Sequence, residues 1–154
     1  MTKVLFVCLG NICRSPLAEG IFQQLLDENE LTDIISCDSC GTSNYHIGGQ
    51  PDSRTQANAA INGVSLNHKA RQFTVNDFSE FDYILPMDTN NFHDVMEFPE
   101  VSSSKASIKL MRDYDTEGKG QDVPDPYFGG DEGFQNVFYI LERSCRGLLK
   151  KLIS

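Results

Sequence analysis

The feature that most constrains the fold is the segment 4–16, which reads Val-Leu-Phe-Val-Cys-Leu-Gly-Asn-Ile-Cys-Arg-Ser-Pro. An apolar run of strand length, 3–8, ends at Cys8, and apolar residues at helical spacing follow the segment directly. Pro16 suits the first turn of a helix, and Ser15 suits the N-cap position before it. The segment therefore predicts a strand, a tight loop and a helix, with Cys8 at the carboxyl end of the strand.

The predicted loop combines a nucleophile with a cradle for an anion. A thiol such as Cys8 ionises more readily at a helix N-terminus beside a cation, and Arg14 offers two parallel donors to phosphate oxygens. Gly10 lets the backbone approach a ligand, and Asn11 tolerates the left-handed conformation of a tight turn. We expect the Ser15 hydroxyl to donate to the sulfur and help it leave. A lone cysteine here would most simply be a buried strand end, but the combination favours a site for a phosphate ester.

Strands and helices alternate along the rest of the chain. Strands are predicted over 34–39, 83–86 and 107–111, helices over 52–62 (ended by Gly63) and 88–96, and one long loop over 113–125. The clearest helix closes the chain, with one apolar face formed by Phe134, Val137, Phe138, Leu141, Cys145, Leu148, Leu149 and Leu152. This alternation is typical of a parallel sheet covered by helices on both faces, whose ligands bind at the carboxyl ends of the strands.

Length and charge exclude several classes of protein. The 154 residues favour one domain over 1–154, and the formal net charge of −9 disfavours nonspecific binding to nucleic acid or to anionic membranes. We expect no nucleic acid partner and no membrane association, because the sequence contains neither an export signal nor an apolar run of membrane-spanning length. A cytoplasmic monomer is the expectation.

The cysteines favour a reducing compartment and argue against a metal site. There are five, an odd number, at positions 8, 13, 37, 40 and 145. Cys37 and Cys40 have CxxC spacing, but a zinc site of this kind would need a second pair. We therefore expect no metal and no cofactor.

The loop sequence CLGNICRSP, residues 8–16, resembles the C-x5-R-S loop of the low molecular weight protein tyrosine phosphatases. Further segments fall in that family's order and roughly its spacing, so the resemblance spans nearly the whole chain. They are 39–43, 68–72, 86–88 and 125–127. The resemblance implies a single-domain α/β fold, a three-layer sandwich whose four-stranded parallel sheet carries the phosphate loop after its first strand. It also implies metal-independent hydrolysis of phosphotyrosine in proteins, and of simple aryl phosphates.

The resemblance assigns a role to each loop residue and to one distant acid. Cys8 is expected to attack phosphorus and form a phosphocysteine intermediate, while Asp125 first protonates the leaving phenolate and then activates water. By itself, Asp125 would be an ordinary turn residue before proline. Phosphate binding is expected from the Arg14 guanidinium and from the backbone amides of Leu9, Gly10, Asn11, Ile12, Cys13 and Arg14.

Other matched positions are expected to support the loop or line the substrate cleft. The supporting network comprises Asn11, Ser15, Ser39 and His68, although His68 would otherwise be read as a surface or core-edge histidine. The cleft is expected to be lined by the aromatic residues Tyr45, Tyr127 and Phe128. Asp88 and Asn91 are expected near its rim, acting on Asp125 or Arg14. Many relatives have a tyrosine where this chain has Phe128, so a hydroxyl and a possible phosphorylation site are lost.

Two alternative functions, and one question about Cys13, stay open from the sequence. An arsenate reductase on the same scaffold would need further redox cysteines, and none lies between Cys40 and Cys145. A noncatalytic phosphate-binding module would not need Cys8, Arg14 and Asp125 together. Cys13 shares the loop with Cys8 and is expected to act as a redox partner, although a small residue filling the loop interior is the simpler reading.

Overall fold

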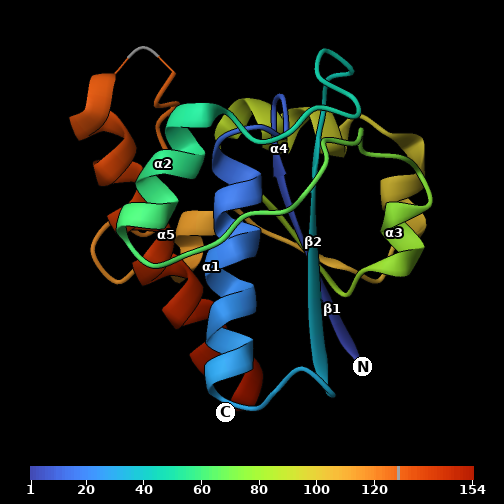
Figure 1. Cartoon of the computed structure of the whole chain (residues 1–154). Coiled ribbons are helices and arrows are strands. Elements are labelled where there is room, and N and C mark those ends of the chain that lie inside the picture. The colour runs from blue at the N-terminus through green and yellow to red at the C-terminus, as the bar shows by residue number, and fades with distance from the viewer. Residues whose placement is uncertain (128) are drawn as a thin grey trace.

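The computed structural model describes residues 1–127 and 129–154 (Figure 1). The elements in chain order are β1 (Thr2–Cys8), α1 (Arg14–Glu28), β2 (Ile35–Gly41), α2 (Ser53–Ile61), α3 (Asp77–Glu80), β3 (Tyr83–Pro86), α4 (Thr89–Met96), the 3-10 helix η1 (Pro99–Ser103), β4 (Ser107–Ile108), the 3-10 helix η2 (Met111–Tyr114) and α5 (Gly130–Ile153). Among the described helices, none is both long and apolar enough to cross a membrane.

A four-stranded parallel sheet with the order β2-β1-β3-β4 forms the middle layer. Side chains of the central strand β1 alternate between two cores, as the period of a strand requires. Val4 and Phe6 face a core shared with α1 and α5, while Leu5 and Val7 face a second core shared with α3 and α4. Figure 1 shows α1 and α5 on one side of β1 and β2, and α3 on the other. The predicted three-layer α/β fold is confirmed.

Helices α1 and α5 pack against each other and cover one face of the sheet. The predicted apolar face of α5 is buried from Phe134 to Leu149, and only Leu152 at its end is partly exposed. In α1, Phe22 packs edge-on against Phe6 of β1, with ring centroids 5.7 Å apart. Each such fully buried side chain contributes roughly 1.5–3 kcal/mol, so α1 is anchored firmly to the strand that carries Cys8.

Several predicted boundaries were wrong. The second strand runs two residues beyond the predicted 34–39, because Cys40 and Gly41 pair with the last residues of β1. The predicted strand 107–111 is only two residues long, since it is an edge strand that pairs with short β3 and then turns into η2. The predicted loop 113–125 accordingly begins inside η2. Helices α3 and η1 are too short to give a periodic pattern and were not predicted.

A buried carboxylate fixes the connection between η2 and α5. Asp115 is 1% exposed and accepts hydrogen bonds from Arg112 Nε, Arg143 Nε and the Glu117 backbone N–H, each at 3.0 Å. Burial opposes ionisation, but the hydrogen bonds from Arg143, the Glu117 backbone and Arg112 outweigh it and lower the pKa of Asp115 below its usual value. The carboxylate therefore stabilises the fold while it is ionised.

We predict that Asp115→Asn lowers the free energy of unfolding by about 3 kcal/mol at neutral pH, because the change leaves two arginines without their buried partner. A lowered native pKa means that this stabilisation is present above the unfolded-state pKa and is lost as the pH falls through the native pKa. Urea unfolding should therefore show the two proteins converging in acid. The control Asp113→Asn, on the same turn but partly exposed, should stay within about 0.5 kcal/mol. A gap that does not narrow in acid would contradict the prediction.

Candidate active site

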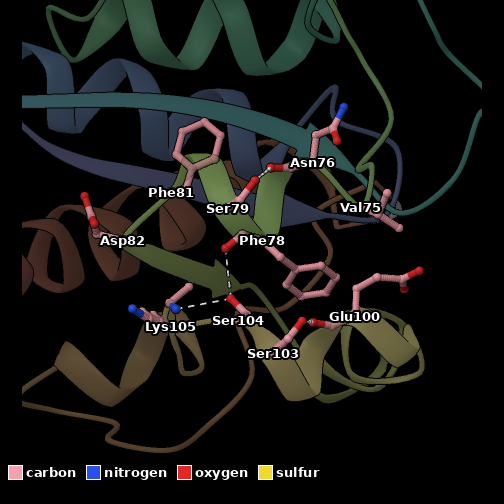
Figure 2. Close-up of a pocket in the computed structure, with 11 residues that line it drawn as sticks. Val75, Asn76, Phe78, Ser79, Phe81, Asp82, Glu100, Ser103, Ser104 and Lys105 are labelled. Carbon is pink, nitrogen blue, oxygen red and sulfur yellow. Dashed lines mark hydrogen bonds between the residues drawn. The ribbon is translucent and has the colours of Figure 1, made fainter.

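One large cavity lies away from the predicted site. It measures about 620 Å³ and lies between α3 and η1, with Phe78 and Phe81 in its wall (Figure 2). The Ser104 hydroxyl donates a hydrogen bond to the Phe78 carbonyl there. None of its eleven lining residues is a cysteine, histidine or arginine. A smaller cavity of about 220 Å³ lies at the carboxyl end of β1. Its lining includes the predicted nucleophile Cys8, the predicted cation Arg14 and the predicted acid Asp125. The types of the lining residues, and not the volume of the cavity, therefore identify the site.

The smaller cavity is formed mainly by the loop that joins β1 to α1. Its lining residues are Cys8, Leu9, Gly10, Ile12, Cys13, Arg14, Tyr45, His46, Asp125 and Tyr127. Asn11 is not among them, because its side chain is buried behind the loop, and its φ of 57° lies in the left-handed region. The predicted phosphate-binding residues therefore surround one cavity, with Asn11 turned away from it.

The Cys8 sulfur lies among donors at the base of the cavity. Its Sγ is 2.9 Å from the Ser15 hydroxyl and accepts the Asn11 backbone N–H at 3.3 Å. The prediction that Ser15 is the N-cap of the helix was wrong. Helix α1 begins two residues earlier than predicted, at Arg14 with Cys13 as its N-cap residue. The Ser15 hydroxyl contacts Cys8 Sγ and the Cys40 carbonyl instead of an α1 amide. The sulfur thus has one backbone N–H donor, with the Ser15 hydroxyl also within hydrogen-bond distance.

The Asn11 side chain connects all the predicted supporting residues. Its Nδ2 donates to Ser15 Oγ at 2.7 Å and to Ser39 Oγ at 3.0 Å. Its Oδ1 accepts the backbone N–H of Arg71 at 3.0 Å and lies 2.7 Å from His68 Nε2. The amide thus fixes the loop to β2 and to the segment after α2. A satisfied polar network of this kind rigidifies the loop.

Arg14 is buried between acidic and carbonyl oxygens at the wall of the cavity. Its Nη1 donates to Asp88 at 2.7 Å and to the Val123 carbonyl at 3.0 Å, and its Nη2 lies 4.0 Å from Asp125. Burial opposes the charge, but Cys8 and then Asp88 outweigh burial and raise the pKa of Arg14. Asp88 also caps α4 by accepting the Asn91 backbone N–H. Asp88 therefore orients the cation, as expected from its position near the rim.

The predicted acid lies at the rim of the cavity and is open to solvent. The Asp125 side chain is 55% exposed, and its Oδ1 accepts the Tyr127 backbone N–H at 3.0 Å. Tyr45 and Tyr127 line the same rim and are largely exposed, at 75% and 44%. The remaining predicted cleft residue, Phe128, lies outside the described residues. An exposed carboxyl group and two exposed rings thus lie at the entrance of the cavity.

Sequence reasoning missed two residues at this entrance. His46 lines the cavity next to Tyr45, and the run of glycine and polar residues around it gave no periodic signal. Arg54 of α2 donates to the Tyr127 carbonyl at 2.8 Å, and its guanidinium lies 4.7 Å from the Tyr127 ring centroid. Its partner Asp52, the N-cap of α2, is 3.1 Å away. The spacing of Asp52 and Arg54 indicates a local pair but not its distant target.

The remaining cysteines are protonated at neutral pH. Burial raises the pKa of Cys13 to about 11, and it also raises the pKa values of Cys37, Cys40 and Cys145 above their usual range. All five cysteines are free thiols. Among the contacts of residues 1–127 and 129–154, Cys8 is the cysteine whose sulfur meets both a backbone amide and a hydroxyl.

Behind the loop, burial acts on two further ionisable groups. Burial is the main reason that the pKa of Glu19 rises to about 7, against the lowering effect of the hydrogen bond from Ser39. Burial also lowers the pKa of His68, partly offset by Asp38. The charged forms of Glu19 and His68 are therefore both disfavoured, although the two groups lie within hydrogen-bond distance.

Comparison with known proteins agrees with this geometry. The family model described as low molecular weight phosphotyrosine protein phosphatase matches residues 3–154. The human low molecular weight phosphotyrosine protein phosphatase is 44% identical over 150 residues, which cover 97% of this chain and 94% of the human protein. The chain belongs to this family. The predicted membership is confirmed, and the chain is a phosphatase of the cysteine-dependent type.

Solved structures in the low molecular weight phosphatase family share the fold over nearly the full chain. A crystal structure of protein tyrosine phosphatase from Entamoeba histolytica has a TM-score of 0.92 and 40% identity, covering 99% of this chain and 97% of that one. The structure of DARP, described as a drosophila arginine phosphatase, has a TM-score of 0.89 and 34% identity and covers 99% of each chain. Proteins that share this fold are therefore named as phosphatases of more than one phosphorylated residue.

A glycine of β2 allows the close approach of the loop that joins β1 to α1. A Cβ added at Gly41 would lie 2.6 Å from the Leu9 carbonyl oxygen and 3.1 Å from the Asn11 nitrogen. Both neighbours are backbone atoms of the loop, so neither can move without displacing the loop.

We predict that Gly41→Ala lowers kcat/KM for an aryl phosphate by about a hundredfold, since catalytic rates fall by this order for displacements near 1 Å. The control is Gly133→Ala in α5, where an added Cβ meets only the Pro126 carbonyl oxygen at 3.9 Å. Steady-state kinetics and thermal unfolding of both variants test the prediction. Full activity in Gly41→Ala would show that the loop does not need this close approach.

Proposed function

We propose that this chain is a protein tyrosine phosphatase that hydrolyses phosphotyrosine through a phosphocysteine intermediate on Cys8. The observation that carries the proposal is the setting of the Cys8 sulfur, which receives the Asn11 amide at 3.3 Å, lies 2.9 Å from the Ser15 hydroxyl and shares its cavity with Arg14. Phosphate transfer to cysteine needs a sulfur nucleophile beside a cation that can bind the phosphate oxygens, and this cavity contains both.

In the first step the Cys8 thiolate attacks phosphorus in line with the tyrosyl oxygen. The S–P bond forms as the P–O bond breaks, and the Asp125 carboxyl gives its proton to the leaving phenolate. Charge persists on the three equatorial phosphate oxygens in the transition state, where the Arg14 guanidinium and the loop amides bind them. Asp88, at 2.7 Å from Arg14, holds the guanidinium in place for this contact.

In the second step water hydrolyses the phosphocysteine. The Asp125 carboxylate takes a proton from the attacking water, the new P–O bond forms, and the S–P bond breaks to return Cys8 as a thiolate. A hydrogen bond from Ser15 to the leaving sulfur stabilises the negative charge that develops on it. Asp125 can reach both the leaving oxygen and the attacking water because its side chain lines the cavity and is exposed at its rim.

The walls of the cavity favour an aromatic phosphate ester. Leu9, Ile12, Tyr45 and Tyr127 offer apolar and aromatic surface on which a planar ring can pack. A phosphoarginine side chain, the substrate class named for the drosophila relative, instead carries polar guanidino nitrogens that need hydrogen-bond acceptors. Asp125 is the one carboxylate that lines this cavity in the described part of the chain. We therefore propose phosphotyrosine, and not phosphoarginine, as the substrate.

We predict that the protein releases phenolate from a simple aryl phosphate in the presence of a metal chelator. Cys8→Ser should abolish the release, and Asp125→Ala should lower kcat by about 10² to 10⁴ because a positioned proton donor contributes that much. Inorganic phosphate should inhibit wild type and Asp125→Ala equally, since the loop that binds phosphate is unchanged. A phosphotyrosine peptide should be hydrolysed faster than a phosphoarginine peptide.

The same assay distinguishes the rival functions. Absence of release from the folded wild-type protein would favour a noncatalytic phosphate-binding module. Arsenate reduction with a thiol donor would favour the reductase. Preference for the phosphoarginine peptide would leave the chemistry on Cys8 intact but overturn the proposed substrate.

We also propose that Cys13 protects Cys8 from irreversible oxidation. Oxidation of the Cys8 thiolate gives a sulfenic acid, and attack by the Cys13 sulfur expels water and forms a disulfide. Burial keeps Cys13 protonated and unreactive towards peroxide by itself, so Cys8 is the sulfur oxidised first.

We predict that peroxide-treated protein, digested without reductant, contains a peptide pair joined through Cys8 and Cys13. Dithiothreitol should restore the activity of the wild type but only part of that of Cys13→Ser, whose oxidised Cys8 proceeds to irreversible acids. Equal recovery in wild type and Cys13→Ser would contradict the protective role.

A further inference from the structure

The segment that carries Asp125 is fastened to the rest of the fold a few residues before the acid. The Asp122 side chain reaches α4, where its Oδ1 accepts the Thr89 backbone N–H at 2.9 Å and the Thr89 hydroxyl at 2.8 Å. Next to Asp122, the Val123 backbone N–H donates to the Met87 carbonyl at 2.8 Å. Two successive residues are therefore held against the junction of β3 and α4.

Arg112 of η2 holds the same segment by its backbone. Its Nη1 donates to the Asp122 carbonyl at 3.1 Å, and its own carbonyl accepts the Gly120 N–H at 3.2 Å. Gly118 packs against the guanidinium, where an added Cβ would overlap Arg112 Nη2. Asp115 accepts Arg112 Nε at 3.0 Å and balances the charge of this largely buried group. The loop between η2 and Asp122 is therefore organised around one side chain.

A stiff stretch of backbone joins these anchors to the acid. One residue, Pro124, lies between Val123 and Asp125, and Pro126 follows directly. A proline ring fixes its own φ and confines the preceding residue to extended conformations. Both restrictions apply here, because Val123 and Asp125 each precede a proline. A displacement at Val123 is therefore passed on to Asp125 instead of being absorbed by backbone rotation.

The cation of the site has a support that does not depend on these anchors. Arg14 Nη1 donates to the Val123 carbonyl at 3.0 Å, but it also donates to Asp88 at 2.7 Å. Asp125 accepts the N–H of Tyr127, which belongs to the same segment and moves with it. Loss of the anchors should therefore displace the acid more than the cation.

We propose that Asp122 and Arg112 are positioning residues, which set where Asp125 presents its carboxyl group to the leaving oxygen. Both side chains lie outside the set that lines the catalytic cavity, so each acts through the backbone at Val123. The inference rests on the proposed role of Asp125 as general acid. It goes beyond that role by placing the control of the acid at α4 and η2.

The choice of leaving group separates a misplaced acid from a general loss of activity. Phenyl phosphate has a basic leaving oxygen that needs a proton from Asp125, whereas dinitrophenyl phosphate releases a stable phenolate that does not. The ratio of kcat/KM for dinitrophenyl phosphate to kcat/KM for phenyl phosphate therefore reports the position of the acid. A smaller fraction of active protein would lower both values equally and leave this leaving-group ratio unchanged.

We expect Asp122→Ala to lower kcat/KM for phenyl phosphate about tenfold, part of the ~10² to 10⁴ that a positioned proton donor contributes, and to spare dinitrophenyl phosphate. Asp122→Asn keeps an oxygen for both Thr89 donors and should restore the wild-type ratio. Thr89→Val removes one donor and should raise the ratio by about threefold, the worth of one hydrogen bond. Inhibition by inorganic phosphate should stay within about twofold throughout, since Arg14 keeps its bond to Asp88.

Two further variants test Arg112 and the effect of charge. Gly118→Ala places a methyl group against Arg112 Nη2 and displaces the guanidinium, so the leaving-group ratio should rise as in Asp122→Ala. Asp113→Ala is the matched control, because Asp113 lines the same surface cavity as Thr89 and carries the same charge as Asp122. Its ratio should equal that of the wild type. Thermal unfolding shows which variants are folded, and Asp122 and Thr89 are exposed residues whose substitution leaves the core intact.

The outcomes separate this inference from the function on which it rests. Asp125→Ala should raise the leaving-group ratio more than any of the other variants. If Asp125→Ala slows both substrates equally, Asp125 is not the acid and the inference falls with it. If Asp125→Ala raises the ratio while folded Asp122→Ala and Gly118→Ala keep the wild-type ratio, the acid stands and the role of the anchors is refuted.

Discussion

The hydrogen bonds of the Asn11 side chain are the interaction on which the rest of the structure depends. They hold one non-glycine residue at a φ of 57°, which turns the Asn11 backbone N–H towards the Cys8 sulfur and the Asn11 side chain into the protein. The amide contacts Ser15, Ser39, His68 and the Arg71 backbone, so strand, helix and loop support the same turn. These hydrogen bonds hold the loop in the conformation that directs its donors at the sulfur and the cavity.

The parallel sheet brings the distant catalytic parts to that loop. The strands β1, β2 and β3 run in one direction. Cys8 and Gly41, which end β1 and β2, therefore lie at the same edge of the sheet as Met87, which follows β3. The Val123 N–H donates to the Met87 carbonyl at 2.8 Å, and the Val123 carbonyl accepts Arg14 at 3.0 Å. These two hydrogen bonds position the segment that carries Asp125. The long connection after η2 therefore places Asp125 at the rim of the cavity.

Sequence reasoning predicted what periodic patterns and fixed spacing encode. The apolar run before Cys8 and the spacing to Arg14 gave the strand, the loop and the helix, and the long apolar face of α5 gave the covering layer. The N-cap role of Ser15 was wrong because local propensity does not report a tertiary partner such as Cys8 Sγ. The contacts of Arg54 and His46 were missed for the same reason, since their partners lie elsewhere in the fold. The monomeric state and cytoplasmic location stay predictions.

The most direct test of the account is a rapid-quench experiment on the wild-type protein. The enzyme is mixed with an aryl phosphate, stopped in acid within a single turnover, digested and examined by mass spectrometry. A Cys8 nucleophile supported by the closed loop predicts a transient phosphoryl group on the peptide that contains Cys8, bound to its sulfur. Turnover without any covalent phosphate, or with the phosphate on another residue, would contradict the account.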